Sequence, residues 1–151
     1  MLQESLEQEL YDNDIELMYY PFSHAIEAVY CDNTVAINKS IEGSQKINAL
    51  TAHELGHFHE CAYNLLEAPP EICAKQETLA QRWATLRVMP IEKILDAYTY
   101  GAQNIYEFCD YLEIDQAFFI EGLLLYAQMY GQQLRYGAYI VSFDPFNITN
   151  E

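Results

Sequence analysis

The most constraining feature of this sequence is a pentapeptide with a histidine at each end, His53-Glu54-Leu55-Gly56-His57. Residues four apart in an α-helix lie on one face, so two imidazoles at this spacing can bind one metal ion. The glutamate after the first histidine stands where a carboxylate can act on a water beside that metal. The alternative is a helix that carries two histidines and a solvated glutamate by chance, although the whole chain has only four histidines.

The residues before the pentapeptide indicate that it lies on a helix. The run 47–52 has the composition of a helix, and Ser44 is its expected N-cap. Ile47 and Leu50 fall on the same helical face as His57, so the histidines should point inward rather than into bulk water. We therefore expect a helix that presents two metal ligands to the interior.

A third ligand must come from another segment, because a catalytic zinc commonly takes three protein ligands and leaves the fourth position to water. The downstream candidates are His59, Glu60, Cys61, Glu67, Glu71, Cys73 and Glu77. His59 is turned by about 200° from His57 and faces away, as a solvated or packing residue would. Cys61 is nearer the right face but lies beyond reach of a shared metal unless the helix breaks.

A second helix is predicted over 71–88, a stretch without glycine or proline that Pro90 ends. On it Glu77, Ala80 and Ala84 recur at i, i+3 and i+7 and form one stripe. Small residues allow another helix backbone to approach closely, so a glutamate at the head of the stripe could reach a metal on the facing helix. The alternative for Glu77 is an exposed helical glutamate.

Together, the two motifs resemble those of the ImmA/IrrE family of metallopeptidases. That family follows its histidine pair with a glutamate, an alanine three residues on, an aromatic-alanine pair and a terminal Met-Pro. Here those positions are Glu77, Ala80, Trp83-Ala84 and Met89-Pro90. The aromatic residue is usually phenylalanine in the family, so Trp83 is a departure. The resemblance covers roughly residues 1–131 in organisation, and its specific motifs lie between 47 and 90.

The resemblance implies that His53, His57 and Glu77 bind Zn²⁺ and that Glu54 is the general base. It implies a zinc-dependent endopeptidase that cleaves a helix-turn-helix transcriptional repressor to relieve repression, often one encoded beside it on a prophage or other mobile element. Zinc would lower the pKa of its bound water to about 7 and polarise the scissile carbonyl. Glu54 would take the water's proton and later deliver it to the leaving amine. Tyrosine is the natural donor for the oxyanion, but the thirteen tyrosines leave the residue open.

Charge limits the partners of this chain. Seven basic and 23 acidic side chains give a net charge of −16. No lysine or arginine precedes Lys39, and the stretch between Ile94 and Leu134 has six acids and no base. Such a surface repels phosphate backbones, so we expect no direct binding of nucleic acid. It favours a basic protein partner, and the simpler alternative is that the charge serves solubility.

Length and segment composition indicate one cytoplasmic domain. The 151 residues suit a single metallopeptidase domain, with a sheet and zinc-binding core over 1–90, a helical subregion over 91–131 and a C-terminal tail over 132–151. No apolar run is long enough to span a membrane, and the N-terminus lacks the pattern of a secretory signal. The widely spaced cysteines are expected to be thiols in a reducing cytosol; they are Cys31, Cys61, Cys73 and Cys109.

The expected fold is α+β and zincin-like, with a small antiparallel sheet packed on the histidine helix and on the glutamate-bearing helix. Leucines at helical spacing predict a first helix over 2–11. Three strand-like runs follow it, separated by turn residues: Ile15–Phe22, Ala25–Cys31 and Thr34–Ile37. In zinc peptidases the edge of such a sheet often aligns an extended substrate by strand addition.

After Pro90 the sequence predicts three helices, Ile91–Tyr98, Ile105–Leu112 and Gln116–Tyr130. The run 105–120 has the spacing of a helix-turn-helix unit. A DNA-reading unit needs basic residues on its second helix, whereas Asp115 and Glu121 are acidic. We therefore interpret this unit as one for packing or partner docking. The stretch Ala138–Phe143 is a candidate last strand, and the residues from Pro145 onward are expected to be loose.

Two other functions remain open at this stage. The first is an acidic antirepressor that binds its repressor without cutting it, with the zinc serving structure. The second, which the sequence favours less, is a general peptidase or a toxin-like protease with other targets. The sequence leaves the oligomeric state open.

Overall fold

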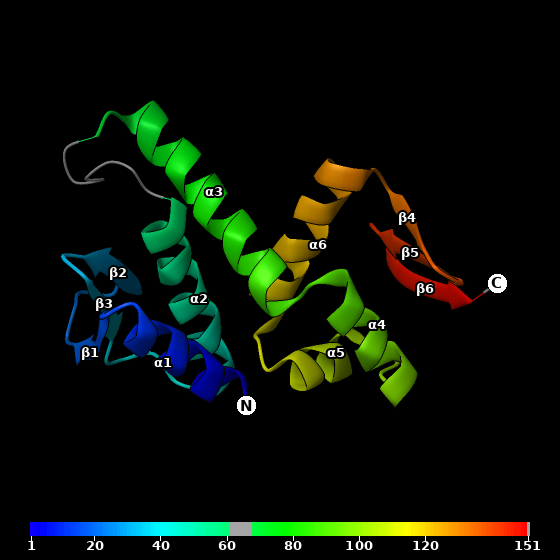
Figure 1. Cartoon of the computed structure of the whole chain (residues 1–151), viewed down its shortest axis with the longest axis horizontal. Coiled ribbons are helices and arrows are strands. Elements are labelled where there is room, and N and C mark those ends of the chain that lie inside the picture. The colour runs from blue at the N-terminus through cyan, green and yellow to red at the C-terminus, as the bar shows by residue number, and fades with distance from the viewer. Residues whose placement is uncertain (61–67, 151) are drawn as a thin grey trace.

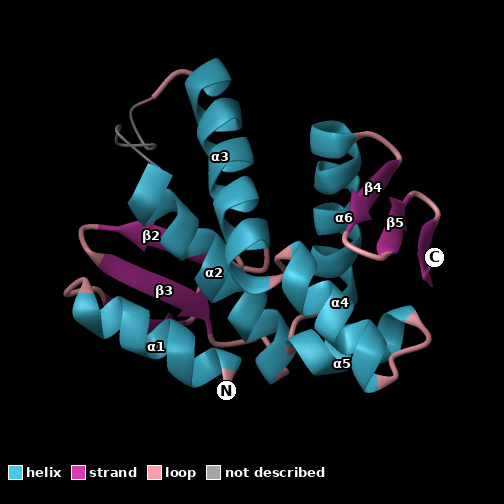
Figure 2. Cartoon of the chain, turned by 45° about the vertical axis from the view of Figure 1, so that its right-hand side comes forward, coloured by secondary structure: helices cyan, strands magenta, loops and turns pink. Residues whose placement is uncertain are grey.

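The computed structural model describes residues 1–60 and 68–150, and within them the chain has an α+β architecture of six helices and two three-stranded sheets (Figure 1). In chain order the elements are α1 (Leu2–Asp12), β1 (Glu16–Tyr20), β2 (Ala28–Cys31), β3 (Thr34–Asn38), α2 (Ser44–Glu60), α3 (Pro70–Val88), α4 (Ile91–Tyr100), α5 (Ile105–Leu112), α6 (Gln116–Tyr130), β4 (Gln133–Tyr136), β5 (Tyr139–Phe143) and β6 (Phe146–Asn150). The first sheet lies with α1 and α2 on one side of the molecule. The second sheet lies with α4, α5 and α6 on the other side, and α3 runs between the two (Figure 2).

The predicted helices are present, and their ends lie close to the predicted residues. α5 and α6 have the predicted bounds, α4 is two residues longer than Ile91–Tyr98, and α2 begins at Ser44. In α1 the leucines at helical spacing, Leu2, Leu6 and Leu10, are buried in the core. None of the described helices is long and apolar enough to cross a membrane.

The first sheet is mixed, so the expectation of an antiparallel sheet was wrong. Its order is β1-β3-β2, with β2 antiparallel and β1 parallel to the central strand. Asp32 and Asn33 adopt left-handed φ values of 48° and 55° and join β2 to β3 as a tight hairpin. β3 is the most buried of the three strands and therefore takes the centre, so β1 pairs with its free edge. This order makes β2 an edge strand, and β2 contacts α2.

The segment after α6 is a second sheet, so the prediction of a loose end from Pro145 was also wrong. β4, β5 and β6 form an antiparallel meander in which Phe146–Asn150 pairs along Tyr139–Phe143. The ring of Phe146 lies 5.0 Å from that of Phe108 and 5.3 Å from that of Phe119. Burial of alternate apolar side chains against the helices thus orders a strand that is only five residues long.

Candidate metal centre and cleft

The close approach of α2 and α3 is made possible by two small residues. A Cβ atom added at Gly56 would lie 2.3 Å from the carbonyl oxygen of Ala80, a distance at which only glycine fits. Ala80 and Ala84 are fully buried. The small-residue stripe predicted for α3 is therefore confirmed as the surface that faces α2.

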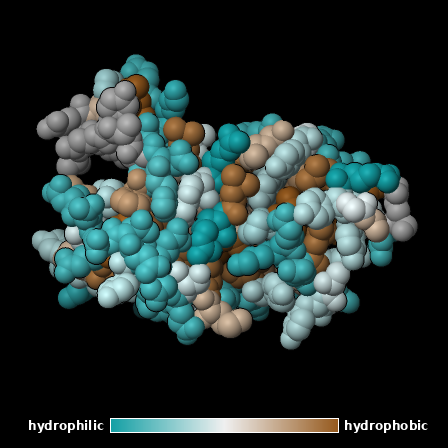
Figure 3. Space-filling model, in the orientation of Figure 1, coloured by the Kyte–Doolittle hydropathy of each residue, from teal (hydrophilic) through white to brown (hydrophobic). Residues whose placement is uncertain are grey.

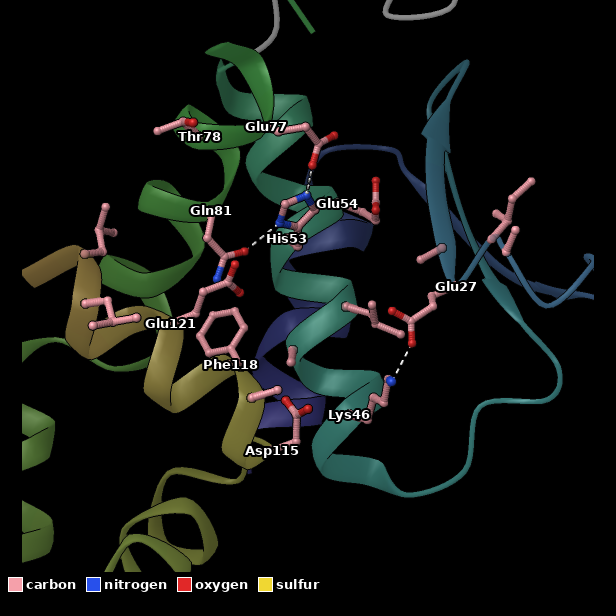
Figure 4. A pocket seen from close by; sticks show the side chains of 18 of the residues that line it. Glu27, Lys46, His53, Glu54, Glu77, Thr78, Gln81, Asp115, Phe118 and Glu121 are labelled. Carbon is pink, nitrogen blue, oxygen red and sulfur yellow. Dashed lines mark hydrogen bonds and ion pairs between the residues drawn. The ribbon is translucent and has the colours of Figure 1, made fainter. Parts of the chain in front are cut away.

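This crossing brings the three predicted ligand groups together. The Nε2 atoms of His53 and His57 lie 2.9 Å and 2.8 Å from the two carboxylate oxygens of Glu77. One ligand atom from each of the three residues lies within 4.8 Å of the others. Figure 4 shows His53 on α2 directed at Glu77 on α3. These three residues are called the metal triad below.

The chemistry of the metal triad suits zinc. Two imidazole nitrogens and one carboxylate form a ligand set that catalytic zinc takes in metallopeptidases. Hydrogen bonds with His53 and His57 lower the pKa of Glu77 well below its usual range, so this carboxylate is ionised and can bind a cation. Burial disfavours the protonated form of His53, but hydrogen bonds with Glu77 and Gln81 outweigh burial and raise its pKa.

Gln81 orients the first histidine of the triad. The Nδ1–H of His53 donates to the Oε1 atom of Gln81 at 2.7 Å. This hydrogen bond fixes the ring and directs Nε2 toward Glu77, as partners of metal-bound histidines usually do. The sequence analysis missed Gln81. Its position four residues after Glu77, on the same helical face, could have indicated it.

Glu54 lies beside the triad in a largely closed environment and is only 6% exposed. Burial raises the pKa of its carboxyl group above the usual range, and the nearby imidazoles of His53 and His57 oppose that rise. The backbone N–H of Tyr30, on the edge strand β2, donates a hydrogen bond to Glu54. The carboxylate of Glu54 therefore lies between α2 and the edge strand β2.

The other predicted ligand candidates do not join the triad. The ring of His59 stacks on Trp83 with centroids 4.5 Å apart, and its Nε2 atom lies 3.3 Å from Glu9. His59 therefore faces away from the triad as expected, and packing on Trp83 is one of the two roles predicted for it. Within the described ranges, Glu60, Glu71 and Cys73 belong to no metal cluster. Two candidates, Cys61 and Glu67, lie outside the described residues, and no disulfide joins the three described cysteines, Cys31, Cys73 and Cys109.

A cleft of about 770 Å³ opens beside the triad, between the sheet edge and α6, with α2 as its floor. Its lining comes from residues 25–28, from α2, from α3 and from α6 (Figure 4). In the surface view, brown apolar side chains show between α3 and α6, within a mostly hydrophilic face (Figure 3). No described tyrosine lines the cleft, so the suggested tyrosine donor for an oxyanion has no candidate among these residues.

Comparison with known proteins gives no relative: no family model matches the chain, and no curated protein has a significantly similar sequence. The side chains of the site and the two sequence motifs are therefore what indicates a function.

Proposed function

We propose that the chain is a zinc-dependent endopeptidase of the ImmA/IrrE type, with a zincin-like core, and that it cleaves a helix-turn-helix transcriptional repressor. The observation that carries the proposal is the convergence of His53, His57 and Glu77 from two helices, with Glu54 buried beside them. These four side chains are the ligands and the general base that the two linked motifs predict. Three of them, His53, Glu54 and Glu77, line a cleft with room for a polypeptide.

The protein groups have distinct roles in peptide hydrolysis. Zinc bound by the metal triad would supply a Lewis acid that activates water for attack on the scissile carbonyl. The Glu54 carboxylate takes the proton of the attacking water and delivers it to the leaving amine nitrogen. Its raised pKa suits this role, because a general base works best with a pKa near the working pH. Gln81 holds the His53 ring in the orientation that leaves Nε2 for the metal.

The sheet edge gives the substrate a path past Glu54. β2 is an edge strand, and residues 25–28 line the cleft. An extended peptide that adds to this edge would run between the sheet and α6, past the carboxylate that Tyr30 holds. Strand addition uses main-chain hydrogen bonds for affinity, so the cleft can accept a segment of a protein without reading every side chain.

The charge of the chain supports a DNA-binding protein as the target. A net charge of −16 disfavours contact with DNA and attracts the basic face of a repressor. The same attraction would serve an antirepressor that binds without cutting. Cleavage must therefore be tested directly.

The test mixes the zinc-loaded protein with the helix-turn-helix regulator encoded beside its gene and follows both fragments and DNA release. We expect fragments that a chelator abolishes. Glu54→Gln should retain zinc and lose cleavage, whereas His53→Ala or Glu77→Ala should lower the zinc content. The matched control is Glu60→Gln, an exposed glutamate at the end of α2, which should change neither.

Two outcomes would contradict the proposal. If Glu54→Gln cuts as fast as the wild type, Glu54 is not the base. If the repressor stays intact and yet leaves its DNA, the chain is a binding antirepressor and the zinc serves structure.

A further inference from the structure

The wall of the cleft formed by α6 carries two acids in a regular row. Asp115, which precedes the first residue of α6, and Phe118 and Glu121 recur every three residues and line the cleft (Figure 4). Residues at this spacing are neighbours on one helical face. The row therefore presents a carboxylate, an aromatic ring and a second carboxylate along the path of any chain that occupies the cleft.

Within the described lining, these two acids have no basic partner. Lys46, the one lysine or arginine there, forms an ion pair with Glu27 across the lower end of the cleft. The hydrogen bond to Glu27 raises the pKa of Lys46, and the charge of Asp115 adds to that rise from nearby. No lysine or arginine of the described cleft lining forms an ion pair with Asp115 or Glu121. Because Lys46 is paired with Glu27, this wall of the cleft keeps a net negative charge.

Two buried polar atoms of residues that line the cleft have no hydrogen-bond partner among the residues that the structure describes. Three buried side-chain polar atoms lack a partner among the described residues, and two of them, Asp115 Oδ1 and Gln81 Nε2, belong to side chains that line the cleft. Buried polar atoms are nearly always satisfied, and leaving one without a partner is costly. The side chains of Asp115 and Gln81 therefore keep hydrogen-bonding capacity that the described protein groups do not use.

An apolar surface continues the row. Leu124 and Leu125 line the same cleft beyond Glu121, and Leu124 is 46% exposed. Removing the apolar surface of these leucines from water is favourable, so the hydrophobic effect would stabilise an apolar side chain of a bound polypeptide there.

We propose that Asp115 and Glu121 select the substrate, so that the cleft takes an extended polypeptide segment with a lysine or arginine directed at the α6 wall and an apolar side chain against Leu124. The inference rests on the proposed function. It specifies the substrate class of the proposed peptidase, namely polypeptide segments with basic and apolar side chains rather than acidic ones.

The length of the cleft limits where the basic residue lies. Lys46 and His53 are seven residues apart on α2, which corresponds to about 10 Å along the helix axis. An extended chain advances by about 3.3 Å per residue, so this span holds about three substrate residues. The basic residue should therefore lie within about three positions of the cleaved bond.

The test profiles cleavage in a library of peptides prepared with a glutamate-specific protease, which leaves lysine and arginine inside the peptides. Wild type should cut bonds with lysine or arginine enriched within three positions. The cleft double variant Asp115→Asn/Glu121→Gln should still cut but lose that enrichment. It is expected to fold, because asparagine is as good a residue as aspartate at a helix start. The control double variant Glu16→Gln/Asp96→Asn removes two exposed acids outside the cleft and should keep the enrichment.

A binding measurement separates this inference from the proposed function. It uses Glu54→Gln protein and two labelled nonapeptides, one alternating leucine with arginine and one with glutamine in place of arginine. The arginine peptide should bind about tenfold more tightly, the scale of one charge-assisted hydrogen bond. The cleft variant should lose this difference and the control variant should keep it.

Each outcome decides one of the two proposals. Absence of cleavage with intact arginine selectivity in binding would count against the peptidase and support the α6 selectivity. Cleavage without basic enrichment, enrichment that survives in the cleft variant, or equal binding of both nonapeptides would overturn the selectivity.

Discussion

The substitution Gly56→Ala tests whether the contact between α2 and α3 sets the metal site. The added methyl would lie 2.3 Å from the Ala80 carbonyl oxygen, whereas an ordinary contact begins at 3.4 Å. The helices must therefore separate by about 1 Å. Overpacking costs about 1–3 kcal/mol, and the upper end applies because a backbone carbonyl cannot rotate away. Alanine regains about 1 kcal/mol of helix propensity, so the net loss of stability should be about 2 kcal/mol.

The same displacement should weaken metal binding. Metal–ligand distances tolerate changes of only about 0.2 Å, and a shift of α3 carries Glu77 away from His53 and His57. We expect the zinc affinity to fall at least about tenfold, the scale seen when supporting residues of a metal site are lost. For a chain of this length the stability loss corresponds to a Tm lower by about 4–8 °C. Thermal unfolding in chelator gives the first quantity, and titration with a competing chelator gives the second.

Gly122→Ala is the matched control. Its added methyl would lie 2.4 Å from the sulfur of Met89, the end of a flexible side chain on the C-terminal side of α3. The Met89 side chain is fully buried but unbranched and flexible, so it yields more easily than a backbone carbonyl. The Tm should therefore fall less, and the zinc affinity should not change. If Gly56→Ala shows the Tm and zinc affinity of the wild type, the Gly56–Ala80 contact does not set the site.

Two further predictions concern residues that support the site. Gln81→Leu removes the acceptor for His53 Nδ1–H and should weaken zinc binding by about 10–100-fold. Gln81→Glu keeps an acceptor and should bind zinc nearly as tightly as the wild type. Equal zinc affinities for the wild type and both variants would show that Gln81 does not support the site. Asn38 donates to three carbonyls of the loop before β2, at 2.8–3.3 Å, and is 3% exposed. Asn38→Ala should therefore cost about 2 kcal/mol in urea unfolding, and a loss below about 0.5 kcal/mol would place it among ordinary surface changes.

The helices were predictable because their signals are local. Pro90 ends α3 at the expected place, and the periodic leucines of α1 mark its buried face. The placement of His53 and His57 on one helical face followed in the same way, since their spacing is a property of one helix. Glu77 was open by geometry alone, and the resemblance of the second motif favoured it.

The errors arose where the outcome depends on distant residues. The parallel direction of β1 follows from the central position of β3 in the sheet. The residues of β1 alone do not indicate that position. The strand β6 is stabilised by packing of Phe146 against aromatic rings of α5 and α6, which are distant in sequence. Asp115 showed its acidic charge in the sequence, but its place on the wall of a cleft opposite β2 depends on the whole arrangement.

The site has an internal regularity that links its packing to its chemistry. On α2, His53 and His57 lie three residues before and one residue after Gly56. On α3, Glu77 and Gln81 lie three residues before and one residue after Ala80.

The two helices run in opposite directions (Figure 1). A residue that follows Gly56 on α2 therefore lies opposite a residue that precedes Ala80 on α3, and the reverse also holds. His57 thus meets Glu77 at 2.8 Å, and His53 meets Gln81 at 2.7 Å. Because glutamate is long, its second oxygen also reaches His53. The glycine in the pentapeptide is therefore not a free position: it lets α3 approach closely enough to supply both Glu77, the third proposed ligand, and Gln81, which orients His53.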